Sequence, residues 1–219
     1  KLNSVLGLSS IPADVLSLSG LWHDIGKAHP AFQGSIQHPQ RPDRKDIAKA
    51  PKEAWKKPLY VMAEGERRAG FRHEMATAMA LLSVLERHNP SHRALLGEHK
   101  ELLEKLGHAM PSLPKESTPS QAEQKLLALD EARFNLLLYL VCSHHGKVRA
   151  AWNASPQDQD YRDRDGRGMP VRGIREGDKL PAIAFEDVHG QACELPVMEL
   201  HLDPASIGLS PRTGASWTE

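Results

Sequence analysis

Apolar residues recur every three or four positions over most of the first 150 residues, a pattern that predicts helices. A first helix is expected in residues 12–25, with Pro12 in its first turn. A second helix is expected to follow the segment FRHE at residues 71–74 and to stop at Asn89-Pro90. The apolar stripes of these two helices consist of Val15, Leu18, Trp22 and Ile25 in the first, and of Met75, Met79, Leu82 and Leu85 in the second.

Two further helices complete the predicted helical part of the chain. Residues 92–107 have an amphipathic pattern. Ser120 and Glu123 form a capping box, which predicts one long helix from Ser120 through about His144. The latter half of this helix, FNLLLYLVC (134–142), is apolar nearly all round, so we expect it to be central to the core.

Other segments have no helical pattern. Residues 38–58 contain four prolines and many charges, which favours an excursion on the surface. Residues 155–168 are polar and rich in turn-forming residues. Residues 182–202 are typical of two or three short strands around a turn at His189-Gly190.

The expected organisation is one mainly α-helical domain over residues 1–219. It has a helical core (1–150), a polar loop with a β insertion (151–210) and the start of a further helix at residues 216–219, where Ser216 and Glu219 repeat the capping-box pattern. Because a helix begins at this point, we expect the chain to be a fragment of a larger polypeptide.

Composition narrows the class of protein. With 40% hydrophobic and 26% charged residues, the 219-residue chain has the composition of a soluble globular protein. It has no run of eighteen apolar residues, so no membrane partner is expected. Cys142 and Cys193 are too few for a disulfide framework, which favours the reducing cytoplasm. The formal net charge is zero, so a polyanion would have to be held locally.

The placement of the twelve histidines indicates a metal site. One predicted helix ends in His23-Asp24 and another in His144-His145, and the C-terminal end of a helix favours a nearby cation. Neighbouring side chains on a helix point about 100° apart, so each pair suits two neighbouring metals, or one metal and a substrate phosphate. His73, at the start of the second helix, is a third candidate.

This ligand set restricts the metal. Imidazole and carboxylate together suit Mn, Fe, Co, Ni or Zn, and the Asp24 carboxylate is the natural bridge between two ions. The alternative is that each histidine is a solvated helix cap. The combination of His-Asp-x-Gly-Lys with a later His-His-Gly that ends an apolar helix favours the metal site.

His23-Asp24-Ile25-Gly26-Lys27 resembles the motif of the HD superfamily of metal-dependent phosphohydrolases. The segments WHDIGKAHPAFQ, RHE and HHG, in this order, are similar to the HD nuclease domain of the CRISPR-associated helicase–nuclease of type I systems. The resemblance covers about residues 12–150. It implies an HD-domain helical bundle, with a small β-hairpin insertion near the C-terminus.

The resemblance also implies a role for each matching residue. His23 and Asp24 would bind metal, with Asp24 bridging two divalent ions, and His73, His144 and His145 would serve the second ion. The ions would be Mn, Co, Ni or Fe, with Mg also compatible.

Lys27 would contact the scissile phosphate or stabilise its developing charge, so Asp24 and Lys27 are the catalytic candidates. The family pattern also has an upstream histidine and an aspartate on a helix after His-His-Gly. No histidine precedes His23. Asp187 and Asp203 lie in strand or loop sequence, so the helix starting at Ser216 is the better place for the missing aspartate.

The implied function is endo- and exonucleolytic hydrolysis of DNA, mainly single-stranded, in type I CRISPR antiviral interference. The implied partners are single-stranded DNA, a helicase domain in the same polypeptide and a crRNA-guided surveillance complex. One alternative is an HD phosphohydrolase acting on nucleotides or cyclic nucleotides, which a closed pocket over Asp24 would favour. An open basic groove would favour the nuclease. A second alternative is a non-catalytic docking domain.

Several other residues are weaker candidates for a functional role. The basic residues between Arg41 and Lys57, with Trp55 among them, suit either strand binding or a solvated loop, and so do the arginines between Arg162 and Arg175. Phe32 and Gln33 are expected to fix the turn after the HD motif. His29 is a weaker candidate for the edge of the site, and Cys142 is expected to pack in the core.

Overall fold

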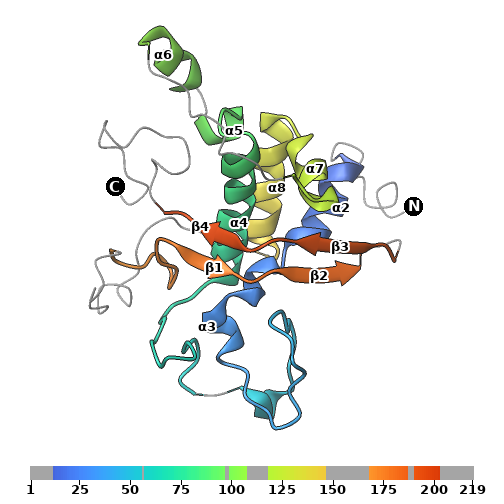
Figure 1. Cartoon of the computed structure of the whole chain (residues 1–219), viewed down its shortest axis with the longest axis vertical. Coiled ribbons are helices and arrows are strands. Elements are labelled where there is room, and N and C mark those ends of the chain that lie inside the picture. Colours follow the sequence, from blue (N-terminus) through green and yellow to red (C-terminus); the bar gives the residue numbers. More distant parts are fainter. Residues whose placement is uncertain are drawn as a thin grey trace.

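The computed structural model describes residues 12–55, 57–96, 99–107, 118–146, 168–186 and 190–202. This part of the chain is mainly helical with a small antiparallel β insertion near the C-terminus, as the sequence predicts (Figure 1). The helices are α2 (Ala13–Trp22), η2 (Ile25–Ala28), α3 (Pro30–Gln33), η3 (Lys52–Ala54), α4 (His73–His88), α5 (Arg93–Leu96), α6 (His99–Lys105), α7 (Gln121–Leu127) and α8 (Glu131–Ser143). The strands are β1 (Asp178–Leu180), β2 (Ile183–Glu186), β3 (Ala192–Leu195) and β4 (Met198–Leu200).

Helix α4 is the centre of the fold. Every residue from Glu74 to Leu85 is buried, which includes the four positions of the predicted apolar stripe. This buried part of the helix is covered mainly by α8, η2 and β4. The prediction that residues 134–142 are central is only partly right: Phe134, Leu137, Val141 and Cys142 are buried, but Tyr139 is 57% exposed.

The predicted single helix from residue 120 to residue 144 is wrong, because α7 and α8 are separate helices. The capping box at the start of α7 is present. Asp130 begins α8 by accepting a hydrogen bond from the backbone N–H of Arg133 (2.8 Å). The His92 ring donates to the carbonyl of Leu129 (3.0 Å), so a long-range contact secures the break between the two helices.

The predicted helix over residues 92–107 corresponds to two short helices, α5 and α6, with residues 97–98 outside the described part. Leu95 is buried, whereas Leu102 and Leu106 on the α6 side are 52% and 63% exposed. Figure 1 shows α6 set apart from the other helices. The amphipathic pattern of this segment therefore does not correspond to one packed helix.

The four strands form one interrupted antiparallel ribbon. β1 pairs with β4 and β2 pairs with β3, and the register of the first pair continues unchanged into the second. Pro181 and Pro196 lie between the two pairs, where this register sets Pro181 against Val197 and Pro196 against Ala182. The missing proline N–H groups interrupt the ladder there. The sequence predicted the strands after residue 182 but not β1, whose three residues are too few for an alternating pattern.

The ribbon lies across the helices, with β4 against α4 and β3 against α7 (Figure 1). A buried ion cluster secures its start. Arg68 donates two hydrogen bonds to the Asp178 carboxylate (2.7 and 3.0 Å), and His29 Nε2 donates a third (3.1 Å). Burial alone would raise the pKa of Asp178, but the hydrogen bonds from His29 and Arg68 hold it well below its ordinary value. The segment after the HD motif is thereby fixed to β1.

Some predictions lie outside the described residues, among them the helix at 216–219, Asp187, Asp203, and Arg162, Arg164 and Arg167. Within the described residues, no helix has both the length and the apolar character that a membrane span requires.

Candidate metal centre

The HD motif forms a tight turn between α2 and η2. His23 is the C-cap of α2, and Asp24 precedes the first residue of η2. A Cβ on Gly26 would overlap the carbonyl oxygen of His73 and lie 2.7 Å from the backbone nitrogen of Thr77. The Gly26 N–H donates to Thr77 Oγ1 (2.9 Å). The glycine of the motif is therefore required by the close approach of this turn to the first turns of α4.

The structure brings together all the side chains that the sequence predicted for the site. They come from the α2–η2 turn, the start of α4 and the end of α8. They are His23, Asp24, Lys27, His73, His144 and His145. The Nε2 atom of His73 lies 3.3 Å from the Nε2 atoms of both His144 and His145. One ligand atom from each of these three histidines lies within 4.8 Å of the other two.

Three of the imidazole rings are oriented by acceptors on their outer side. In each, Nδ1 faces an oxygen atom that can only accept a hydrogen bond. The acceptors are Gly20 O for His23 (2.8 Å), Val141 O for His144 (2.6 Å) and a Glu74 carboxylate oxygen for His73 (3.3 Å). Since Nδ1 carries the proton in this arrangement, the lone pair of Nε2 points into the site, as a metal ligand requires.

The two carboxylate oxygens of Asp24 have different surroundings. Oδ2 accepts a hydrogen bond from Lys27 Nζ (2.8 Å) and lies 3.4 Å from His23 Nε2. Oδ1 is buried and has no hydrogen-bond partner among the described residues, although it lies 3.6 Å from His73 Nε2 and 3.8 Å from His144 Nε2. A buried oxygen without a partner is costly. A cation between Oδ1 and the imidazoles would remove this cost.

The charges around Asp24 keep it ionised. Burial on its own raises the pKa of Asp24, but the hydrogen bond and the charge of Lys27, together with His23 and His73, hold the pKa below its ordinary value. Burial lowers the pKa of His73 to about 4, and the charge of Lys27 acts in the same direction. A neutral imidazole and an ionised carboxylate are the forms that bind metal.

The spacing of the donor atoms suits a metal ion. Metal–nitrogen bonds of about 2.0–2.1 Å in a tetrahedral site place the ligand atoms about 3.3–3.4 Å apart. The two 3.3 Å separations from His73 to His144 and to His145 match this value. These three histidines can therefore hold one ion. Asp24 Oδ1 lies beside them, 3.6 Å from His73 Nε2 and 3.8 Å from His144 Nε2, and His23 with Asp24 Oδ2 offers a second position.

Glu74 belongs to this group of side chains but was not among the predicted site residues. It is only 2% exposed, and its carboxylate lies 3.3 Å from His73 Nδ1 and 3.8 Å from His145 Nε2. A buried carboxylate behind a ligand histidine fixes the orientation of the ring. The sequence feature that could have identified Glu74 is its position in the segment RHE, directly after His73.

Phe32 and Gln33 fix the turn after the motif, as expected. The Gln33 side chain donates to the carbonyls of Lys27 (2.6 Å) and Ile47 (3.0 Å). The Phe32 ring meets the rings of His73 and Trp55 edge-on, with centroids 6.2 and 5.4 Å away. Trp55 therefore packs within the fold.

Two arginines of the basic stretch at residues 41–57 are engaged within the protein. Arg41 donates to the carbonyls of Gln33 and Ile36 (2.6 and 2.7 Å), and Arg44 makes a bidentate pair with Asp46 (2.9 and 2.8 Å). Neither arginine is therefore part of a free cationic track. His29 lies in the Asp178 cluster described above, not at the edge of the site, because it is fully buried there.

An adjacent histidine and aspartate at a helix end, facing histidines from two other helices, is the arrangement of an HD-type metal-binding domain. The family model "Cas3, HD domain" matches residues 7–207, and the chain belongs to this family of HD-type metal-dependent nucleases from type I CRISPR systems. The match includes the β ribbon as well as the helices. Comparison with the curated proteins and with the solved structures gave no match.

Proposed function

We propose that this chain hydrolyses phosphodiester bonds in DNA, mainly in single strands, with two divalent transition-metal ions. The cluster of His73, His144 and His145 beside Asp24 Oδ1, a buried oxygen with no hydrogen-bond partner among the described residues, carries this proposal. Mn, Co, Ni or Fe suits this mixed imidazole and carboxylate set, and Mg is also compatible.

Each side chain has a role that its position supports. His73, His144 and His145, with Asp24 Oδ1, would hold the first ion, and His23 with Asp24 Oδ2 would hold the second, with Asp24 shared between them. When bound, the ions supply hydroxide from water and stabilise the leaving oxygen. The second ion has fewer protein ligands among the described residues, so it is the more weakly bound of the two.

Lys27 is placed to act on the substrate phosphate. Its ammonium group lies 2.8 Å from Asp24 Oδ2, and its side chain is 14% exposed. A fixed, partly buried cation at this point stabilises the negative charge that the phosphate gains in the transition state. Lys27 and Asp24 are therefore the proposed catalytic residues.

The accessibility of the site favours a polymeric substrate over a small nucleotide. The side chains of His23 and His145 are each 40% exposed, so the centre is not enclosed by the described residues. In keeping with the family resemblance, we place the chain in the cytoplasm, as one domain with a helicase domain in the same polypeptide. A crRNA-guided surveillance complex would recruit it.

The test uses the full chain and its Asp24→Ala variant with circular single-stranded DNA, circular duplex DNA and mononucleotides, each with Mn, Co, Ni or Mg. Loss of the single-stranded circles only with metal, abolished by the substitution, is the expected result. Intact DNA with hydrolysed nucleotides would support a nucleotide phosphohydrolase instead. If metal binds and neither substrate changes, the docking domain becomes the better interpretation.

A further inference from the structure

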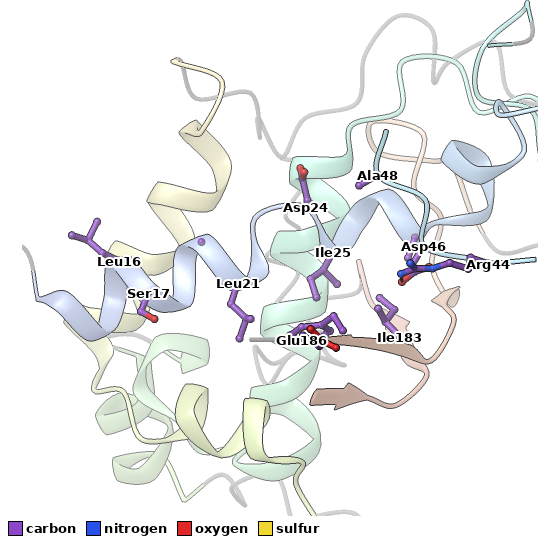
Figure 2. A pocket seen from close by; sticks show the side chains of 13 residues that line it. Leu16, Ser17, Leu21, Asp24, Ile25, Arg44, Asp46, Ala48, Ile183 and Glu186 are labelled. Carbon is purple, nitrogen blue, oxygen red and sulfur yellow. Dashed lines mark hydrogen bonds and ion pairs between the residues drawn. The ribbon is translucent and has the colours of Figure 1, made fainter. Parts of the chain in front are cut away.

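A groove of about 520 Å³ lies between α2, residues 44–48 and strand β2, and Asp24 is one of its lining residues. Figure 2 shows Leu16, Ser17 and Leu21 along one part of it, Arg44 and Asp46 at the other end, and Asp24 between them. The volume lies in the range of small-molecule sites. Because Asp24 belongs to both the groove and the metal centre, an occupant of the groove would lie next to the residues that would hold the ions.

We propose that this groove binds an unpaired base of the substrate strand, next to the phosphate held at Asp24. The inference rests on the proposed nuclease function and adds to it a physical reason for the preference for single strands. A base in a duplex has its faces stacked and its edge paired, so it cannot enter a groove in the protein without leaving the helix.

The lining of the groove suits a base better than a sugar–phosphate backbone. Apolar side chains of Leu21, Ile25 and Phe185 form part of its wall, and the Phe185 ring can stack on the face of a base. Its polar groups include the carboxylate of Glu186, which repels phosphate but accepts hydrogen bonds from amino groups such as N4 of cytosine. Arg44, the nearby cation, is already paired with Asp46.

Gly20 supports the proposed base site independently of the lining. It lies within α2, where glycine is less stable than alanine. A Cβ at this position would meet nothing within 4 Å, and no unusual backbone conformation requires glycine there. Gly20 also lines the groove. Nothing among the described residues therefore requires glycine here, whereas a large side chain in its place would occupy the space that the proposed base fills.

The test compares an oligo-dC strand with an abasic strand of equal length, in Mn, with the full chain. The native protein is expected to cleave the oligo-dC strand at least about fivefold faster, from the lower end of the usual contribution of a base stacked on an aromatic side chain, here Phe185. Gly20→Phe and Ser17→Trp, which fill the groove from exposed positions of α2, are expected to bring this ratio close to one. Gly20→Ala is the matched control and retains the ratio. Thermal unfolding establishes that each variant is folded.

Equal cleavage of both strands by the native protein would overturn the proposal, and so would an unchanged ratio in both filled variants. If the native protein cleaves neither strand, the proposed nuclease function fails. In that case, binding of the two strands measured by fluorescence anisotropy without metal tests whether the groove binds a base. Tighter binding of oligo-dC than of the abasic strand, lost in the filled variants, supports it, and equal binding overturns it.

Discussion

The backbone N–H of Gly26 donates a hydrogen bond to the side-chain oxygen of Thr77 over 2.9 Å, and this contact joins the HD turn to α4 one turn after His73. We predict that Thr77→Val lowers the free energy of unfolding by about 1–3 kcal/mol, because a buried N–H loses its partner. Thr77→Ser keeps the hydroxyl and is expected to lose less. Urea denaturation of the two variants measures the difference, and equal losses would show that the hydrogen bond contributes nothing.

Gly26→Ala tests the same contact from the other side. The added methyl group would overlap the carbonyl oxygen of His73, so either the HD turn or the start of α4 must move. We expect a loss of about 1–3 kcal/mol in stability from overpacking and a weaker affinity for Mn, measured by isothermal titration calorimetry. Gly20→Ala, whose methyl group has free space, is the control and should be stable. Unchanged Mn affinity in Gly26→Ala would contradict this view of the motif.

The parts of the fold that depend on local pattern could be predicted from the sequence. The stripe from Met75 to Leu85 identified α4, and the capping box at Ser120 identified the start of α7. The break before Asp130 was missed because the apolar pattern runs through it. Only the distant contact from His92 to the carbonyl of Leu129, together with the Asp130 cap, shows why the chain stops and restarts there.

The metal site, too, has residues that a local motif predicts and residues that only the packing of the fold brings in. Residues in recognisable motifs, such as His23 and Asp24, could be proposed directly from the sequence, and the fold brings them together with the other predicted side chains. Glu74 could not be chosen over other acidic residues, because its burial behind His73 is a property of the packed helices. The pairing of Arg68 with Asp178 joins residues far apart in the sequence, and no local pattern predicts such a contact.

Glu74 should determine metal affinity without contacting the substrate. Its carboxylate faces Nδ1 of His73 and fixes the ring that carries the central Nε2 ligand. Glu74→Ala is therefore expected to weaken the binding of Mn by about 10–100-fold, the usual cost of losing such a supporting group. Glu74→Gln keeps an oxygen acceptor and should lose less. Calorimetric titration with Mn provides the measurement, and native-like affinity in Glu74→Ala would rule out this supporting role.

Lys27 should affect catalysis more than metal binding. Its ammonium group lies beside Asp24 and repels a cation, so Lys27→Gln is expected to bind Mn at least as tightly as the native chain. The rate of phosphodiester cleavage should fall by about 10²–10³-fold, since a charge that stabilises the transition state is lost. Lys27→Arg keeps the charge and is the matched control. A variant that lost metal and activity together would indicate a structural role for Lys27.

Asp178 should make the stability of the fold sensitive to acid. Its pKa is well below the ordinary value of about 3.9, despite burial that acts in the opposite direction, because His29 and Arg68 donate hydrogen bonds to the ionised form. A carboxyl group whose pKa is lowered in the folded state stabilises that state fully above the unfolded pKa, and the contribution is lost as pH falls below it. The free energy of unfolding should therefore decrease as the pH falls from about 5 towards the lowered pKa.

Asp178→Asn isolates this contribution. The variant leaves the buried guanidinium of Arg68 without its carboxylate, so we expect it to be less stable than the native chain by about 3–5 kcal/mol at pH 7. As the pH falls below about 4, the native chain loses the stabilisation that the variant already lacks, so the two stabilities should converge. Asp14→Asn is the control, because Asp14 is an exposed aspartate on α2 whose side chain is 49% accessible. Urea denaturation of the three proteins between pH 7 and pH 3 measures the trend. A difference between native and Asp178→Asn that stays constant over this range would mean that Asp178 stabilises the fold through packing and not through its charge.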